Sequence, residues 1–184
     1  FRLDPDVATS DVQRFSELCR AIPRMTSVEA ARAYDEVASL YRNDLLTEPS
    51  FEWVYERDDR GLCLQERYRQ EFERTTKYVA RLLTDNGHPD RAVRLYKTLL
   101  HAEPTLEDIA RELYRCYAQM GDRNALVQEH RHLQEALRQM LGEPQDADDV
   151  FELEPESIEV YEECLATIDR GRVSEDAASQ LKVG

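Results

Sequence analysis

Apolar residues recur along most of the chain at steps of three and four residues, which is the spacing of amphipathic helices. The first apolar stripe follows Ser10, whose S-x-x-Q pattern with Gln13 predicts a capped helix start, and Thr26 with Glu29 gives a second such signal. The pattern predicts no β-strands. The expected helices span about residues 10–22, 27–42, 51–60, 62–86, 89–101, 105–120, 122–141 and 158–168.

Turn residues mark the ends of these helices. Asn43 and Asp44 are expected to close the second helix, Gly87 follows the longest one, and Pro89 suits the first position of the next. Further breaks between helices are expected at Pro104–Thr105, at Met120–Gly121 and at Gly142–Pro144. Beyond Gly171 we expect a weak short helix or a tail.

The length of 184 residues predicts one folding unit. Residues 1–9 form a short extended lead-in, residues 10–168 the helical domain and residues 169–184 a C-terminal tail. Within the domain, residues 145–154 are rich in Asp and Glu and predict an acidic loop or linker before the last helix.

Two glycines, Gly87 and Gly121, are 34 residues apart, and each lies between two expected helices. This is the tetratricopeptide period. After Gly87 come a small residue, Ala92, an aromatic residue, Tyr96, and a helix-ending proline, Pro104, at the spacings of that repeat. Glycine closes the turn, alanine lets paired helices approach, the aromatic ring fills the space between pairs and proline ends the second helix. The predicted fold is therefore an all-α, tetratricopeptide-like helix-pair solenoid of about three pairs plus a C-terminal packing helix.

Several short motifs carry a resemblance to a known family. They are Pro104–Glu107, Gly121–Asp122, Leu141–Pro144, the opening Phe1–Leu3 with Asp11, Val12 and Phe15, and a tyrosine, leucine and tryptophan pattern at Tyr41, Leu45, Leu46, Trp53 and Arg57. Together they resemble the bacterial transcriptional activator domain of Streptomyces antibiotic regulatory proteins over residues 10–168. Residues 57–66 look like an insertion, and His130 stands where an aromatic residue is usual.

The resemblance implies a regulatory domain of a transcription regulator. A winged-helix DNA-binding domain would precede residue 1, so DNA would be bound only through a domain outside this chain. The implied protein partners are that DNA-binding domain, a second copy of the chain, or RNA polymerase.

The net charge is −14, which repels a nucleic-acid backbone. With no long apolar run and no signal-peptide pattern at the N-terminus, the sequence predicts a soluble, cytoplasmic protein without membrane contact. The four cysteines have no metal-ligand spacing and are expected to be reduced structural thiols.

A groove is the candidate site. In tetratricopeptide stacks the first helix of each pair lines a concave surface, and counting inward positions from the two glycines gives five basic residues among eight. They are Arg74, Lys77, Arg81, Arg111 and Arg115. Such a groove suits an acidic peptide, a free carboxyl terminus or a phosphorylated ligand. The alternative is that these residues form ordinary ion pairs with Glu71, Glu73, Glu107 and Glu112 on neighbouring turns.

Signatures of catalysis are missing from the sequence. It contains no dinucleotide-binding, P-loop, zinc-protease or nucleophile-elbow motif, so we expect no enzyme activity, no cofactor and no metal. Trp53 could anchor a partner, although a lone tryptophan in an amphipathic stretch more often belongs to the core.

Three functional hypotheses stay open. The first is a protein-interaction or sensor domain that controls an attached DNA-binding domain through docking, dimerisation or ligand binding. The second is a freestanding tetratricopeptide adaptor that binds acidic peptides. The third is a groove for a small phosphorylated ligand.

Overall fold

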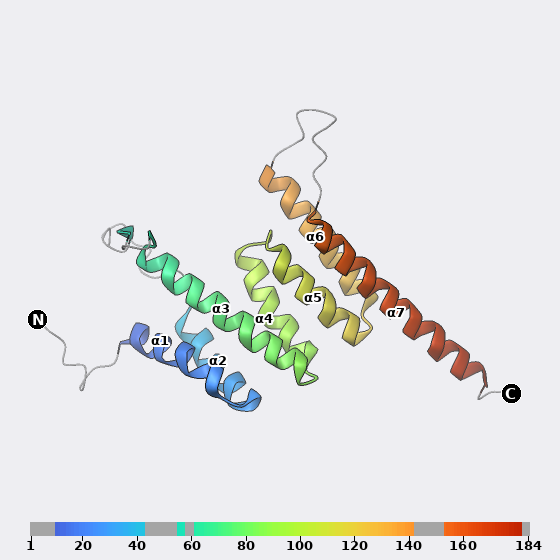
Figure 1. Ribbon diagram of the computed structural model, residues 1–184, viewed down its shortest axis with the longest axis horizontal. Helices are drawn as coiled ribbons and strands as arrows, with labels where there is room; N and C mark the ends of the chain where they lie inside the picture. Colours follow the sequence, from blue (N-terminus) through green and yellow to red (C-terminus); the bar gives the residue numbers. More distant parts are fainter. Residues whose placement is uncertain (1–9, 43–54, 58–60, 142–152, 182–184) are drawn as a thin grey trace, which may run out of the picture. The chain divides into compact units, whose positions relative to one another are not determined.

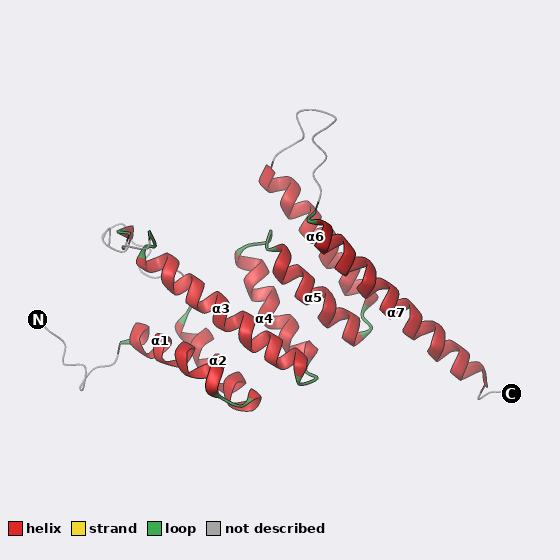
Figure 2. Cartoon of the chain, viewed as in Figure 1, coloured by secondary structure: helices red, strands yellow, loops and turns green. Residues whose placement is uncertain are grey.

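The computed structural model describes residues 10–42, 55–57, 61–141 and 153–181. Helices make up nearly all of this part of the chain, and it contains no strand (Figure 2). The predicted all-α helix-pair solenoid is confirmed. The chain falls into two compact units, Phe1–Asn86 and Gly87–Gly184, which meet at the Asn86–Gly87 turn.

The first unit contains α1 (Asp11–Ala21), a short 3-10 helix (Ile22–Arg24), α2 (Ser27–Leu40) and α3 (Leu64–Asp85), shown in Figure 1. The side chain of Ser10 accepts a hydrogen bond from the Gln13 N–H at 3.2 Å, which caps α1 as predicted. At α2 the capping box is complete, because Thr26 and Glu29 each accept from the other's backbone N–H. The local sequence therefore determines where both helices begin.

Aromatic and aliphatic side chains from all three helices form the core of the first unit. Tyr41 stacks on Phe72 with ring centroids 4.3 Å apart. The hydroxyl of Thr76 donates to the Phe72 carbonyl at 2.8 Å, and the hydroxyl of Tyr34 lies 2.9 Å from Thr76 Oγ1. Because the Thr76 proton is already engaged, Tyr34 donates to Thr76. These two hydrogen bonds give both hydroxyls a partner inside the core.

The second unit contains α4 (Pro89–Ala102), α5 (Glu107–Met120), α6 (Arg123–Leu141) and α7 (Pro155–Leu181). Helix α5 is central, because α4, α6 and α7 all pack against it. Six of its side chains are at most 3% exposed: Ile109, Ala110, Leu113, Tyr114, Cys116 and Tyr117. In Figure 1, α7 runs alongside α6, and it packs back on the unit as the sequence predicts.

Gly121 closes α5 in a left-handed conformation with φ of 68°. The N–H of Asp122 donates to the carbonyl of Tyr117, and the N–H of Gly121 donates to that of Ala118, which is the Schellman pattern. Gly87 is also left-handed, with φ of 78°. Both glycines of the predicted repeat therefore occupy turns that L-residues adopt at a cost.

Some predicted boundaries differ from the observed ones. Helix α2 ends at Leu40, before Asn43 and Asp44, which lie outside the described residues, as do Phe51 and Trp53. Helix α5 begins at Glu107, two residues after Thr105. Beyond Gly171, where a weak short helix or a tail is expected, α7 continues without interruption to Leu181.

The four cysteines, Cys19, Cys63, Cys116 and Cys164, are buried and form no disulfide. Burial raises the pKa of the Cys19 thiol and of the Cys164 thiol. Both effects keep these thiols protonated, as expected of structural cysteines.

Two glycine substitutions should have opposite effects on stability. A Cβ at Gly121 meets no atom within 4 Å, so Gly121→Ala costs stability only through its positive φ, by about 1 kcal/mol. Gly171 lies inside α7 and is equally open, so Gly171→Ala should stabilise the chain by up to about 1 kcal/mol. Urea denaturation measures both changes. A destabilising Gly171→Ala would contradict the continuous helix.

Candidate functional site

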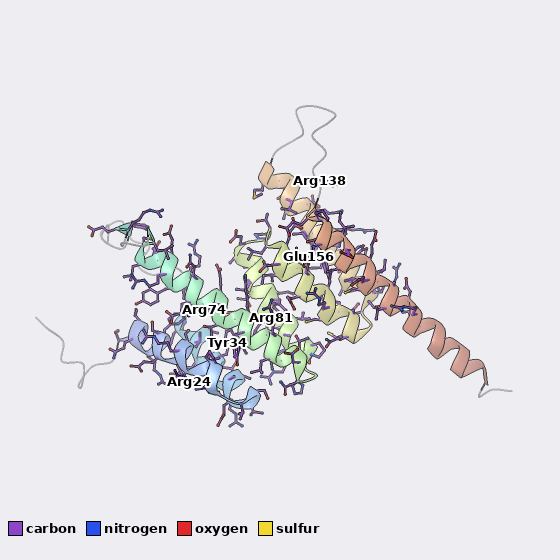
Figure 3. All side chains as sticks on the ribbon, viewed as in Figure 1. Arg24, Tyr34, Arg74, Arg81, Arg138 and Glu156 are labelled. Carbon is purple, nitrogen blue, oxygen red and sulfur yellow. The ribbon has the colours of Figure 1, made fainter. Side chains whose placement is uncertain are left out.

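Three of the predicted basic residues share one side of α3. Arg74, Lys77 and Arg81 are spaced at i, i+3 and i+7, which places them on the same helix face. Arg74 and Arg81, which Figure 3 labels, are exposed. Lys77 is partly exposed. The opposite face of α3 is buried and packs against α1 and α2. The first unit thus presents a basic face, defined here as Arg74, Lys77 and Arg81.

The other two predicted residues, Arg111 and Arg115, lie on α5 in the second unit and have different surroundings. The Arg111 side chain is only 12% exposed. Its guanidinium binds the carboxylate of Glu154 at 2.6 Å and that of Glu156 at 3.6 Å, and it donates to Ser157 Oγ at 2.8 Å. Arg111 therefore holds the N-terminus of α7.

Two further observations strengthen this attachment. Glu107 on α5 accepts a hydrogen bond from the backbone N–H of Glu154 at 2.9 Å. Burial works to lower the pKa of Arg111, but the hydrogen bond to Glu154 and the charges of both glutamates outweigh it and raise that pKa. The sequence analysis placed Glu154 in an acidic loop and missed this pairing. The signal available was a run of glutamates at the start of an amphipathic helix.

Arg115 forms an ordinary ion pair on the surface of its own helix, which is the alternative given in the sequence analysis. It binds Glu112, one turn away on α5, at 3.2 Å, and its side chain is 45% exposed. Glu71, another expected partner, instead accepts from the Ser16 hydroxyl at 3.3 Å. The basic face of α3 and the arginines of α5 belong to different units, and a single groove through all five residues stays a prediction.

An aromatic cluster joins α5, α6 and α7. The rings of His130 and Tyr161 stack with centroids 3.8 Å apart and an interplanar angle of 12°. Tyr114 meets Tyr161 edge-on at 5.8 Å, and its hydroxyl lies 3.3 Å from His130 Nδ1. His130 therefore takes the role of the aromatic residue that is usual at this position. Burial lowers the pKa of His130 and raises that of Tyr114, so both are neutral near pH 7.

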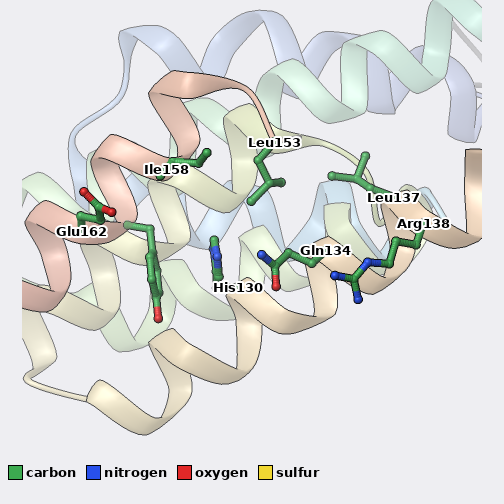
Figure 4. A pocket seen from close by; sticks show the side chains of 8 residues that line it. His130, Gln134, Leu137, Arg138, Leu153, Ile158 and Glu162 are labelled. Atoms are coloured by element: carbon green, nitrogen blue, oxygen red, sulfur yellow. The ribbon is translucent and has the colours of Figure 1, made fainter. Parts of the chain in front are cut away.

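Next to this cluster is a cavity of about 280 Å³ between α6 and α7, shown in Figure 4. A second hollow of about 320 Å³ lies between α4 and α6 over Ala110. In it, Lys97 lies 4.0 Å from Glu129 and 5.9 Å from the ring centroid of Tyr117. Among the described residues, no group of three or more His, Cys, Asp or Glu side chains could hold a metal ion.

Replacing Arg111 should destabilise the second unit more than replacing Arg115. Arg111→Met removes charge-assisted hydrogen bonds of a guanidinium that is 12% exposed, which costs about 1.5 kcal/mol because the two glutamate partners are themselves well exposed. Arg115→Met breaks an exposed pair worth less than about 1 kcal/mol. Urea denaturation of both variants checks this. Equal losses would mean that Arg111 does not anchor α7.

The half-buried His130 should make stability depend on pH. Its folded pKa is below the unfolded value, so the stabilising contribution is complete above pH 6.5 and is lost as pH falls towards the folded pKa. His130→Phe keeps an aromatic ring against Tyr161 but cannot titrate, and should reduce the loss of stability between pH 7.5 and pH 5.5. His132→Gln, at an exposed position of the same helix, is the matched control. Urea midpoints at both pH values measure the effect, and identical slopes in both variants would contradict it.

None of the described helices is long and apolar enough to cross a membrane.

A family model of the bacterial transcriptional activator domain matches residues 10–156, which is most of the chain. Neither a curated protein nor a solved structure matches. The match begins at the cap of α1 and ends in the first turn of α7, so it covers α1 to α6 and only the start of α7. The chain therefore belongs to the bacterial transcriptional activator domain family, whose members are domains of transcription regulators.

Proposed function

We propose that this domain acts as a protein-interaction module that controls an attached DNA-binding domain by docking an acidic protein segment on the basic face of α3. Membership of the activator-domain family supports a role in transcription. The net charge of −14 argues against direct DNA binding by this chain, because it offers little counterion release. A role in transcription without direct DNA binding is compatible with control of the attached DNA-binding domain through contact with a protein.

The exposed basic face is the observation that carries the proposal. Arg74, Lys77 and Arg81 project from one side of a helix whose other side is buried in the first unit. Surface ion pairs of lysine and arginine are worth at most about 1 kcal/mol, so an acidic partner can compete for these side chains. Against an acidic chain, this concentration of positive charge would direct an acidic segment to one face.

The α5 arginines contribute less to docking in this proposal. Arg111 is occupied by Glu154 and Glu156 of the chain itself. Two glutamates at the start of a helix thus bind an arginine of this chain, which supports an acidic helical segment as the kind of partner we propose. The exposed α3 face would receive a comparable segment from a partner.

Charge reversal tests the docking face. The triple variant Arg74→Glu, Lys77→Glu and Arg81→Glu should weaken binding of a fluorescently labelled decapeptide of alternating Glu and Leu by at least about ten-fold, since charged contacts cost about 1.4 kcal/mol or more together. Fluorescence anisotropy in 50 mM and 200 mM salt measures the affinity.

The matched control reverses three exposed arginines elsewhere in the first unit, Arg20, Arg24 and Arg32. It changes the net charge by the same amount and should weaken binding by less than about three-fold, through long-range repulsion alone. Equal losses in both triple variants, or no binding by the unmodified chain, would exclude the α3 face as the docking site.

A further inference from the structure

The cavity between α6 and α7 lies entirely within the second unit. The two helices run antiparallel, because His130 stacks on Tyr161 while Arg123, near the start of α6, binds Asp169 further along α7 at 3.1 Å. Side chains of both helices, together with Leu153 just before α7, line the space of about 280 Å³ (Figure 4). This is close to the lower limit for small-molecule sites.

One wall of the cavity is a row of hydrogen-bond donors on α6. His130, Gln134 and Arg138 line it at i, i+4 and i+8, and so share one helix face over about 12 Å. The Tyr114 hydroxyl lies 3.3 Å from His130 Nδ1, and the neutral imidazole of His130 has one N–H to donate, from either ring nitrogen. The row ends at the guanidinium of Arg138, which is exposed.

The rest of the lining is largely apolar. Leu137 and Leu153 are at most 7% exposed, and Ile158 on α7 is 38% exposed. A large aliphatic side chain left open to water at the edge of a cavity favours an apolar occupant. The occupant would thus contact donors on one side and methyl groups on the other.

The charge of the occupant follows from its surroundings. Arg138 is the single cationic side chain that lines the cavity, and the carboxylate of Glu162 lines it too. In a chain of net charge −14, one guanidinium can balance one negative charge, whereas a dianion such as a phosphate monoester would face repulsion from Glu162. Arginine binds a planar carboxylate with two parallel hydrogen bonds.

We infer that this cavity binds a small monocarboxylic acid with an apolar body. Its carboxylate would pair with Arg138 and the Gln134 amide, and its body would extend along Leu153 and Ile158 towards His130. This site is separate from the docking face on α3, which belongs to the other unit.

Titration of the whole chain with sodium octanoate, followed by NMR of ¹³C-labelled histidines, tests the inference. The chain has four histidines, and the His130→Phe variant identifies the His130 signal. Octanoate should shift the His130 signal and leave the exposed His88 unchanged. Hexanoate should bind more weakly, by about four-fold for each buried methylene removed. 1-Octanol should bind at least about ten-fold more weakly, because it lacks the charge.

Arg138→Gln should weaken octanoate binding about ten-fold or more, whereas Arg131→Gln, at another exposed position of α6, should leave it unchanged. Ile158→Ser should flatten the dependence on chain length. Arg138 and Ile158 are both exposed, so circular dichroism should show that the variants at these two positions are folded. Failure of octanoate to shift His130, equal binding of octanol, or equal effects of the two arginine variants would each overturn the inference. None of these results bears on the charge-reversal test of α3.

Discussion

Burial of α5 is the constraint on which the second unit depends. Like other amphipathic helices, α5 buries one face, and that face is broad: Ile109, Ala110, Leu113, Tyr114, Cys116 and Tyr117 are all at most 3% exposed. Three neighbours, α4, α6 and α7, are needed to remove that surface from water. Because α7 completes the enclosure, the polar residues at its start are brought against Arg111. The ion pairs at this arginine are thus a consequence of apolar packing as much as a cause of it.

The distribution of charge gives the two units different properties. In the second unit, the least exposed arginine of the predicted groove is neutralised by the chain's own glutamates. In the first unit, the basic face of α3 is directed away from the core. The proposal that an acidic partner docks on α3 rests on this contrast, because three basic side chains on one face of an acidic protein create a local positive potential.

His130 shows how one departure from a repeat pattern can change the chemistry of a site. Its ring stacks on Tyr161 and so fills the space that an aromatic residue would fill. Unlike phenylalanine, it also carries two ring nitrogens, one of which is engaged by Tyr114. The same substitution therefore preserves packing, adds a titratable group to the interface of three helices and places a polar ring in the lining of the cavity between α6 and α7.

The sequence alone determined the helices, their caps and the turns at Gly87 and Gly121, because capping hydrogen bonds and left-handed glycines depend on residues a few positions apart. It also identified the family and the basic positions on α3. Contacts between distant segments were decided by the tertiary structure: Arg111 meets Glu154 across 43 residues, and the sequence pattern suggested partners on neighbouring turns instead. The continuation of α7 past Gly171 was missed because glycine weakens a helix locally without ending it. Helical periodicity specifies which face is apolar, but only packing selects the helix that covers it.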